Sequence, residues 1–179
     1  MKILLLSGSF RSNSKSMALL KSIQNYFPEP YYALPQLDEL PFYSDDLSVN
    51  KPDAVLKLLE LVASSDGVVV CSPEYNHSLP AVLKNAIDWA SRPAFKSVLK
   101  DKPVTIITQA NSPVGGARAQ AHIKLIFDST LSVIFPAHEM MISSIDNVFD
   151  QSGSIIDTDV ERRLQRHIAG FFDFVKRNV

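Results

Sequence analysis

Three short apolar runs constrain the fold of this chain more than any other feature. They span Lys2–Ser7, Gly67–Ser72 and Pro103–Gln109, and they are rich in Val, Ile and Leu without alternating polar residues. A strand that is covered on both faces has this pattern, because both rows of its side chains are buried. The three runs therefore predict central strands of a parallel sheet.

Two weaker strands and intervening helices complete the pattern. The weaker strands are predicted at Tyr31–Leu34 and His138–Ile142, and the second could equally begin near Val133. Apolar residues recur at helical spacing between the strands, and the last helix is predicted at about Asp157–Arg177. Five strands alternating with helices predict an α/β fold, a doubly wound parallel sheet with helices on both faces.

Size and charge limit the function classes. With 179 residues, 46% of them hydrophobic, the chain fits one domain, residues 1–179. A net charge of −1 argues against a nucleic acid partner. The only cysteine, Cys71, ends an apolar strand and is expected to be a buried thiol. No segment is long and apolar enough for a membrane span or signal peptide, so we expect a soluble cytoplasmic protein.

A polar loop, GSFRSNSKS at residues 8–16, follows the first predicted strand and runs into a helix. Free N–H groups and the helix dipole at such a junction favour an anion, and hydroxyl and guanidinium groups add donors. The glycine spacing excludes the two best-known phosphate loops. An alternative is that the serines only cap the helix. The candidate phosphate-binding residues are Ser9, Arg11, Ser14, Lys15 and Ser16.

A second junction, PEYNHSLP at residues 73–80, follows the next central strand. It offers flat apolar side chains and directed backbone groups, which suit a planar ring with one apolar and one polar end. Candidate binding residues are Pro73, Glu74, Tyr75 and Asn76. Tyr75 and His77 are candidates for a substrate pocket, although His77 could equally be a solvated loop residue.

A third loop, residues 110–116, follows the strand Pro103–Gln109 and ends in paired glycines that let backbone approach a ligand closely. Its candidates are Gln109, Ser112, Gly115 and Gly116. By itself it could be a simple connection. However, all three loops follow parallel strands, so they emerge at the same edge of the sheet and predict one shared cleft.

The motifs GSFRSNS, PEYNHSLPAVLKNAIDW and GGARAQ together resemble the flavodoxin-like family of NAD(P)H-dependent FMN reductases, which includes quinone, azo and chromate reductases. The resemblance covers nearly the whole chain. It implies a five-stranded sheet of order 2-1-3-4-5, bound FMN, and NAD(P)H as co-substrate. It also implies a small-molecule electron acceptor (a quinone, azo compound, chromate or free flavin) and a homodimer or homotetramer.

The chemistry implied by the resemblance belongs to the flavin, so we expect no catalytic side chain and no metal site. NAD(P)H and the acceptor would use the same cleft in turn, which predicts a ping-pong mechanism. A loop closed around a terminal phosphate predicts FMN in preference to FAD. The alternatives are a flavodoxin-type electron carrier and a noncatalytic FMN-binding regulatory module. The near-neutral charge and the PEYN motif favour the enzyme over the carrier.

Overall fold

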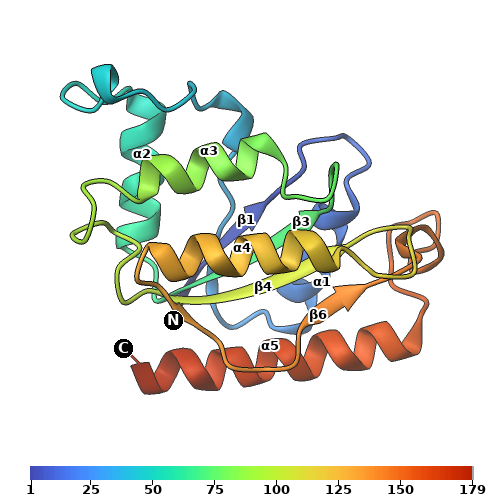
Figure 1. Cartoon of the computed structure of the whole chain (residues 1–179). Helices are drawn as coiled ribbons and strands as arrows, with labels where there is room; N and C mark the ends of the chain where they lie inside the picture. The colour runs from blue at the N-terminus through green and yellow to red at the C-terminus, as the bar shows by residue number, and fades with distance from the viewer. Residues whose placement is uncertain (179) are drawn as a thin grey trace.

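The computed structural model describes residues 1–178 and has a central sheet between two layers of helices (Figure 1). The strands are β1 (Lys2–Ser7), β2 (Tyr31–Ala33), β3 (Gly67–Pro73), β4 (Pro103–Gln109), β5 (Val133–Ile134) and β6 (Met140–Ile142). The helices are α1 (Lys15–Tyr26), α2 (Asp53–Ala63), α3 (Ala81–Ala90), α4 (Ala117–Ser129) and α5 (Thr158–Asn178). The alternation of strands and helices predicted from the sequence is confirmed.

All strand pairs are parallel, and the order is β2-β1-β3-β4-β5 with β6 also on β4. The predicted order 2-1-3-4-5 is therefore confirmed. The three strands β1, β3 and β4 are buried along almost their whole length, as their unbroken apolar sequences predict.

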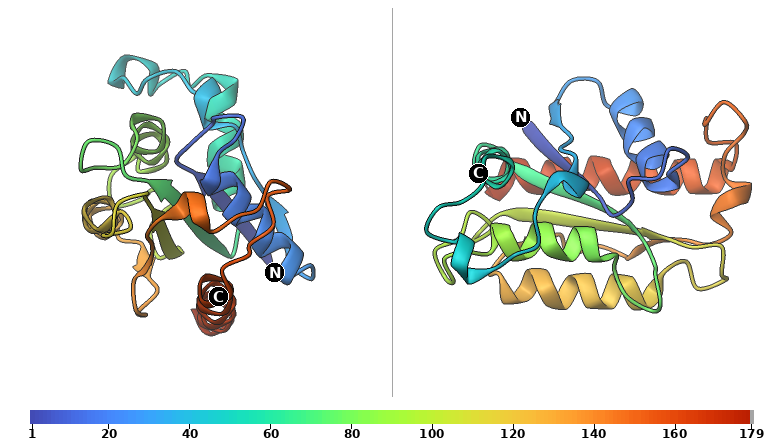
Figure 2. Two further views of the ribbon diagram at one scale, coloured as in Figure 1. Left: turned by 90° about the vertical axis from the view of Figure 1, so that its right-hand side faces the viewer. Right: turned by 90° about the horizontal axis from the view of Figure 1, so that it is seen from above.

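Each face of the sheet has its own apolar core. On one face, α1 and α5 pack against residues such as Leu5, Val69 and Ile107. On the other, α2, α3 and α4 pack against neighbours such as Leu4 and Val70 (Figure 2). Cys71 lies in the first core with no exposed surface, and burial raises the pKa of its thiol to about 12. This agrees with the buried thiol predicted from the sequence.

The fifth predicted strand is split into two pieces. One piece, β5, begins at Val133, and the other, β6, lies within the predicted range His138–Ile142. β5 pairs with β4 at Val104↔Ile134, and pairing resumes with β6 at Ile107↔Met140. Phe135 N still donates to the Val104 carbonyl oxygen at 2.8 Å, and residues 136–139 lie outside the strands. His167 of α5 packs at the break, where its Nε2 lies 2.7 Å from Thr105 Oγ1. The ring of Phe135 packs edge-on against the His167 ring, with 5.5 Å between the ring centres.

The long connection between β2 and α2 is fastened to α3. Trp89 Nε1 donates to the Pro41 carbonyl oxygen at 2.8 Å, and the Asn85 side chain bonds both Pro41 and Tyr43. The rings of Tyr43 and Trp89 meet edge to face at 5.0 Å. Asn85 and Trp89, to which the sequence assigned no chemistry, thus hold this connection in place.

The loops that follow β1, β3, β4 and β6 gather at one end of the molecule, the right-hand end in Figure 1. This is the carboxyl edge of the parallel sheet, where open α/β folds bind ligands. No helix within residues 1–178 is both long enough and apolar enough to cross a membrane.

Candidate functional site

A cleft of about 390 Å³ lies at this carboxyl edge. Seven of the residues predicted from the sequence line it: Ser9, Arg11, Ser14, Lys15, Pro73, Tyr75 and Gln109. Four residues that were not predicted complete the lining: Asn13, Asn111, Ile145 and Asp146. The three loops therefore meet in one cleft, as their places after parallel strands predict. We call it the FMN cleft.

The first loop ends in a helix start that leaves backbone donors free. Ser14 is the N-cap of α1, and its Oγ accepts a hydrogen bond from Met17 N at 3.2 Å. Within residues 1–178, the backbone N–H groups at positions 12, 13, 15 and 16 have no hydrogen-bond acceptor. Unpaired amides at a helix start are the usual cradle of a phosphate group. The serine caps the helix, as the alternative interpretation predicts, and the loop also keeps donors for an anion, so phosphate binding stays a prediction.

Charge at this end of the cleft also suits an anion. Arg11 is exposed, and neither Arg11 nor Lys15 forms an ion pair with any residue of the described chain. The Lys15 ammonium lies 5.3 Å from the centre of the Phe149 ring. Two cations without carboxylate partners can bind a phosphate dianion without first breaking an ion pair.

The second loop forms a tight hairpin beside the cleft. Tyr75 and Ser78 exchange two backbone hydrogen bonds at 2.9 and 3.0 Å, and the two residues between them, Asn76 and His77, have positive φ values of 48° and 65°. This is the geometry of a two-residue turn with both central residues left-handed. Tyr75 lines the cleft with a side chain 46% exposed, whereas Asn76 and His77 form the exposed tip outside its lining.

Glu74 points its carboxylate at a neighbouring helix. Its Oε2 accepts hydrogen bonds from the backbone N–H groups of Arg118 and Ala119, at 3.0 and 3.2 Å, near the start of α4. Gly116, the N-cap of α4, has no side chain to do this. Burial by itself would raise the pKa of Glu74, but these two amides and the Arg118 guanidinium outweigh it and lower that pKa. Glu74 thus joins the second loop to the third.

Replacement of Glu74 tests this link. Glu74→Ala leaves two helix N–H groups without their acceptor and is expected to lower the free energy of unfolding by about 0.5–2 kcal/mol, the usual value of an N-cap. Glu74→Gln keeps an acceptor oxygen and should lose less. Urea denaturation of both variants measures the difference. An unchanged stability in Glu74→Ala would show that the capping bonds contribute nothing, and equal losses in the two variants would show that the carboxylate charge is required.

The third loop supplies backbone and a buried amide. Gly116 has φ = +83°, and a Cβ atom there would come within 3.0 Å of Thr108 Cβ, so only glycine fits without strain. Gly115 N donates to the Ser112 carbonyl oxygen at 3.2 Å. Gln109 Nε2 donates to the buried Ser16 Oγ at 3.3 Å. Ser16, Ser112, Gly115 and Gly116 lie close to the cleft but do not line it.

The residues that sequence reasoning missed share a simple signal. Ile145 and Asp146 follow β6, whose loop reaches the same edge of the sheet as the three loops predicted to bind a ligand. Asn111 and Asp146 are bonded reciprocally: Asn111 Nδ2 donates to Asp146 Oδ2 at 2.5 Å, and Asp146 N donates to Asn111 Oδ1 at 3.1 Å. Asn13 lies within the first loop itself. All four residues follow the carboxyl ends of parallel strands, so the rule that ligands bind at this edge of the sheet could have identified them.

The lining of the cleft contains groups of the kinds that FMN requires. The first loop contributes backbone amides and two cations that have no partner within residues 1–178, and these suit a phosphate. Pro73 and Tyr75 offer flat apolar support for a ring, and the Asn111–Asp146 pair adds polar groups to the lining. No group of three or more His, Cys, Asp or Glu side chains within residues 1–178 is placed to hold a metal ion.

Comparisons with known proteins show the family of this chain. Residues 1–147 match the family described as NADPH-dependent FMN reductase. A quinone reductase of Escherichia coli K12 is 34% identical, with 99% of this chain and 96% of that protein covered. A 2-hydroxy-1,4-benzoquinone reductase of a Burkholderia species is 32% identical, with 98% and 97% covered.

A solved structure extends the likeness to three dimensions. FerB of Paracoccus denitrificans, a flavoenzyme NAD(P)H:(acceptor) oxidoreductase, aligns with a TM-score of 0.91 and 31% identity over 99% of this chain and 98% of that one. The resemblance inferred from the loop motifs is confirmed. This chain belongs to the NADPH-dependent FMN reductase family and is an FMN-dependent oxidoreductase that uses NAD(P)H.

Proposed function

We propose that the protein transfers electrons from NAD(P)H to a quinone by a ping-pong mechanism, with FMN held in the FMN cleft. The observation that carries the proposal is the convergence of Arg11, Tyr75 and Gln109, from three separate loops, on that one cleft. The names of the two relatives reported above support a quinone as acceptor. Azo compounds, chromate and free flavin are further acceptors in this proposal, supported by the family resemblance.

Each part of the chain has a defined task in this proposal. The loop 9–16, with Arg11 and Lys15, binds the phosphate through amides and cations. Tyr75 and Pro73 support one face of the ring, and Gln109 lies at the floor between the loops. The remaining predicted residues (Ser16, Glu74, Asn76, Ser112, Gly115 and Gly116) act through backbone groups or by shaping the loops, and His77 reaches the substrate from the hairpin tip. When bound, FMN supplies the redox chemistry, accepting two electrons from NAD(P)H and passing them on.

Flavin binding and turnover test the central claim. Purified protein is expected to carry FMN, or to bind it on titration, to have that FMN reduced once by anaerobic NAD(P)H, and to continue oxidising NAD(P)H when a quinone is supplied. The visible spectrum and anaerobic addition of NAD(P)H measure both. A protein that binds no FMN contradicts the site. FMN binding without NAD(P)H oxidation would indicate a regulatory module, and preference for a protein partner in single-electron steps would indicate a carrier.

Steady-state kinetics test the order of the reaction. NAD(P)H and the quinone are expected to occupy the same FMN cleft in turn, so the oxidised nicotinamide must leave before the quinone enters. Double-reciprocal plots at several fixed quinone concentrations should therefore be parallel, with the quinone competing against NAD(P)H. Intersecting lines would show that both bind together, which a shared cleft does not allow.

Self-association into a homodimer or homotetramer is part of the proposal. Phe42 and Val49 of the 35–52 connection, and Phe95 after α3, are large apolar residues that lie largely exposed. Contiguous patches of exposed apolar residues are typical of surfaces that bind another chain, and the proposal assigns these three residues to such a surface. Sedimentation of the purified protein, with Phe42→Ser and Phe95→Ser as variants, measures the assembly. A monomer at micromolar concentration would contradict this part of the proposal.

A further inference from the structure

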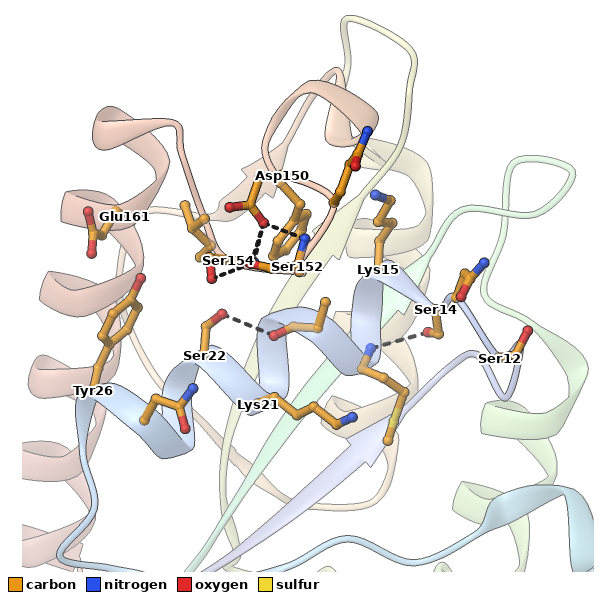
Figure 3. Close-up of a pocket in the computed structure, with 18 residues that line it drawn as sticks. Ser12, Ser14, Lys15, Lys21, Ser22, Tyr26, Asp150, Ser152, Ser154 and Glu161 are labelled. Carbon is orange, nitrogen blue, oxygen red and sulfur yellow. Dashed lines mark hydrogen bonds between the residues drawn. The ribbon is translucent and has the colours of Figure 1, made fainter.

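A larger polar cavity, of about 770 Å³, lies beside the FMN cleft (Figure 3). Its floor is the exposed side of α1, and its opposite wall is the turn around Asp150 together with the start of α5. We call it the α1 groove. In Figure 3, Ser14 and Lys15 lie at one end, while Tyr26 and Glu161 lie at the other. Its volume is within the range of about 300–1,000 Å³ that is usual for small-molecule sites.

The two cavities meet at the phosphate loop. Asn13, Ser14 and Lys15 line both of them, so Lys15 lies on the border between the FMN cleft and the α1 groove. In the proposed function, this border is where the terminal phosphate of FMN is bound. A group attached to that phosphate would therefore continue into the α1 groove, along about 16 Å of helix from Lys15 to Tyr26.

The charge of the groove suits a second phosphate. Lys15 and Lys21 both line it, and neither forms an ion pair with another side chain in the part of the chain that the structure describes. The Asp150 carboxylate is occupied by its own turn, where Oδ1 accepts bonds from the Ser152 hydroxyl at 2.6 Å and from Ser154 N at 3.0 Å. These bonds, of which the one from the Ser152 hydroxyl has the largest effect, lower the pKa of Asp150. The carboxylate thus binds donors of its own turn.

The far part of the groove suits a nucleoside. The half-buried ring of Tyr26 lies in this part of the groove, and aromatic rings are the usual stacking partners of a base. Burial, with a smaller contribution from Glu161, raises the pKa of Tyr26 to about 12, so its hydroxyl stays a donor at neutral pH. Glu161, which lies beside Tyr26 in Figure 3, offers an acceptor for a ribose hydroxyl or an exocyclic amine.

We propose that the α1 groove binds the adenosine 5′-phosphate half of a flavin dinucleotide, so that the chain binds FAD as well as FMN. The inference rests on the proposed position of the FMN phosphate. An adenylate could also come from NAD(P)H, but only FAD carries it on the phosphate that lies at the Lys15 border. The sequence-based preference for FMN assumed that nothing lies beyond the closed loop, and the α1 groove removes that assumption.

Matched titrations of apoprotein test the proposal, because FMN and FAD differ only by the adenylate. In Lys21→Glu, FAD affinity is expected to fall at least tenfold while FMN affinity changes less than twofold. Lys57→Glu makes the same charge change on the exposed side of α2 and should alter neither. AMP alone should compete with FAD but not with FMN.

The outcomes separate this proposal from the proposed function. Failure of wild-type protein to bind FMN would overturn the FMN cleft itself. If FMN binds while FAD does not, or if FAD affinity is unchanged in Lys21→Glu, the groove does not hold the adenylate. Equal loss of FMN and FAD affinity would place Lys21 at the FMN cleft and overturn the proposal. The adenylate in the groove could instead belong to NAD(P)H, and titration of FMN-loaded Lys21→Glu with NADP⁺ tests this. If NADP⁺ affinity falls while FAD affinity does not, the groove binds the co-substrate and the proposal is wrong.

Discussion

FMN affinity is expected to fall about ten- to hundredfold in Arg11→Ala. The guanidinium lies on the cleft without a carboxylate partner in the described chain, so its charge is available to the phosphate. A hydrogen bond to a charged group contributes about 1.5–3 kcal/mol, and each 1.4 kcal/mol is a factor of ten in affinity. Fluorescence titration of the apoprotein with FMN measures this directly.

Two further variants make the result specific to Arg11. Arg11→Lys keeps the charge but loses the fork of donors, so its affinity should lie between wild type and Arg11→Ala. Lys57→Ala removes a positive charge far from the cleft and should leave FMN affinity unchanged. Wild-type affinity in Arg11→Ala would show that backbone amides and Lys15 alone hold the phosphate.

Acid is expected to destabilise the protein through His167. Burial, together with the nearby Arg166 charge, lowers the pKa of His167 to about 4, whereas an unfolded histidine has a pKa near 6.5. Between these values the unfolded chain binds the proton and the folded chain does not. His167 therefore costs no stability above about pH 6.5, and the free energy of unfolding falls as pH drops towards 4. The loss from this group amounts to at most about 3 kcal/mol.

A variant without the titrating ring isolates this effect. His167→Gln keeps a polar partner for Thr105 but cannot be protonated in this range. Urea denaturation of both proteins from pH 7.5 to pH 4 should show a wild-type stability that decreases more steeply than that of His167→Gln. Parallel curves would mean that the imidazolium is tolerated at the break in the fifth strand.

Much of the fold was predictable because its determinants are local in sequence. The strands β1, β3 and β4 are buried on both faces, and such burial leaves an unbroken apolar run that can be recognised directly. α5 was predicted within a residue at each end: Asp157 is its cap, with Oδ1 accepting from Asp159 N and Val160 N at 3.0 Å. The loops after the central strands converge because parallel strands share one carboxyl edge.

The remaining features depend on contacts between distant residues. The break in the fifth strand is stabilised by His167 and Phe135, which lie 32 positions apart in sequence and meet only in the folded chain. Glu74 was predicted to bind the cofactor, and nothing in its local sequence shows that its carboxylate caps a helix 44 residues later. The polar residues of the α1 groove also come from separate segments, so their assembly required the structure.

The broken fifth strand also protects the sheet against aggregation. An edge strand presents unpaired N–H and C=O groups that can pair with another chain, and long, flat, apolar edges are the most dangerous. Here one edge is divided into two pieces, β5 of two residues and β6 of three, and β2 at the opposite edge has only three. A chain with such long apolar central strands thus keeps both of its outer edges too short to act as templates for a neighbouring molecule.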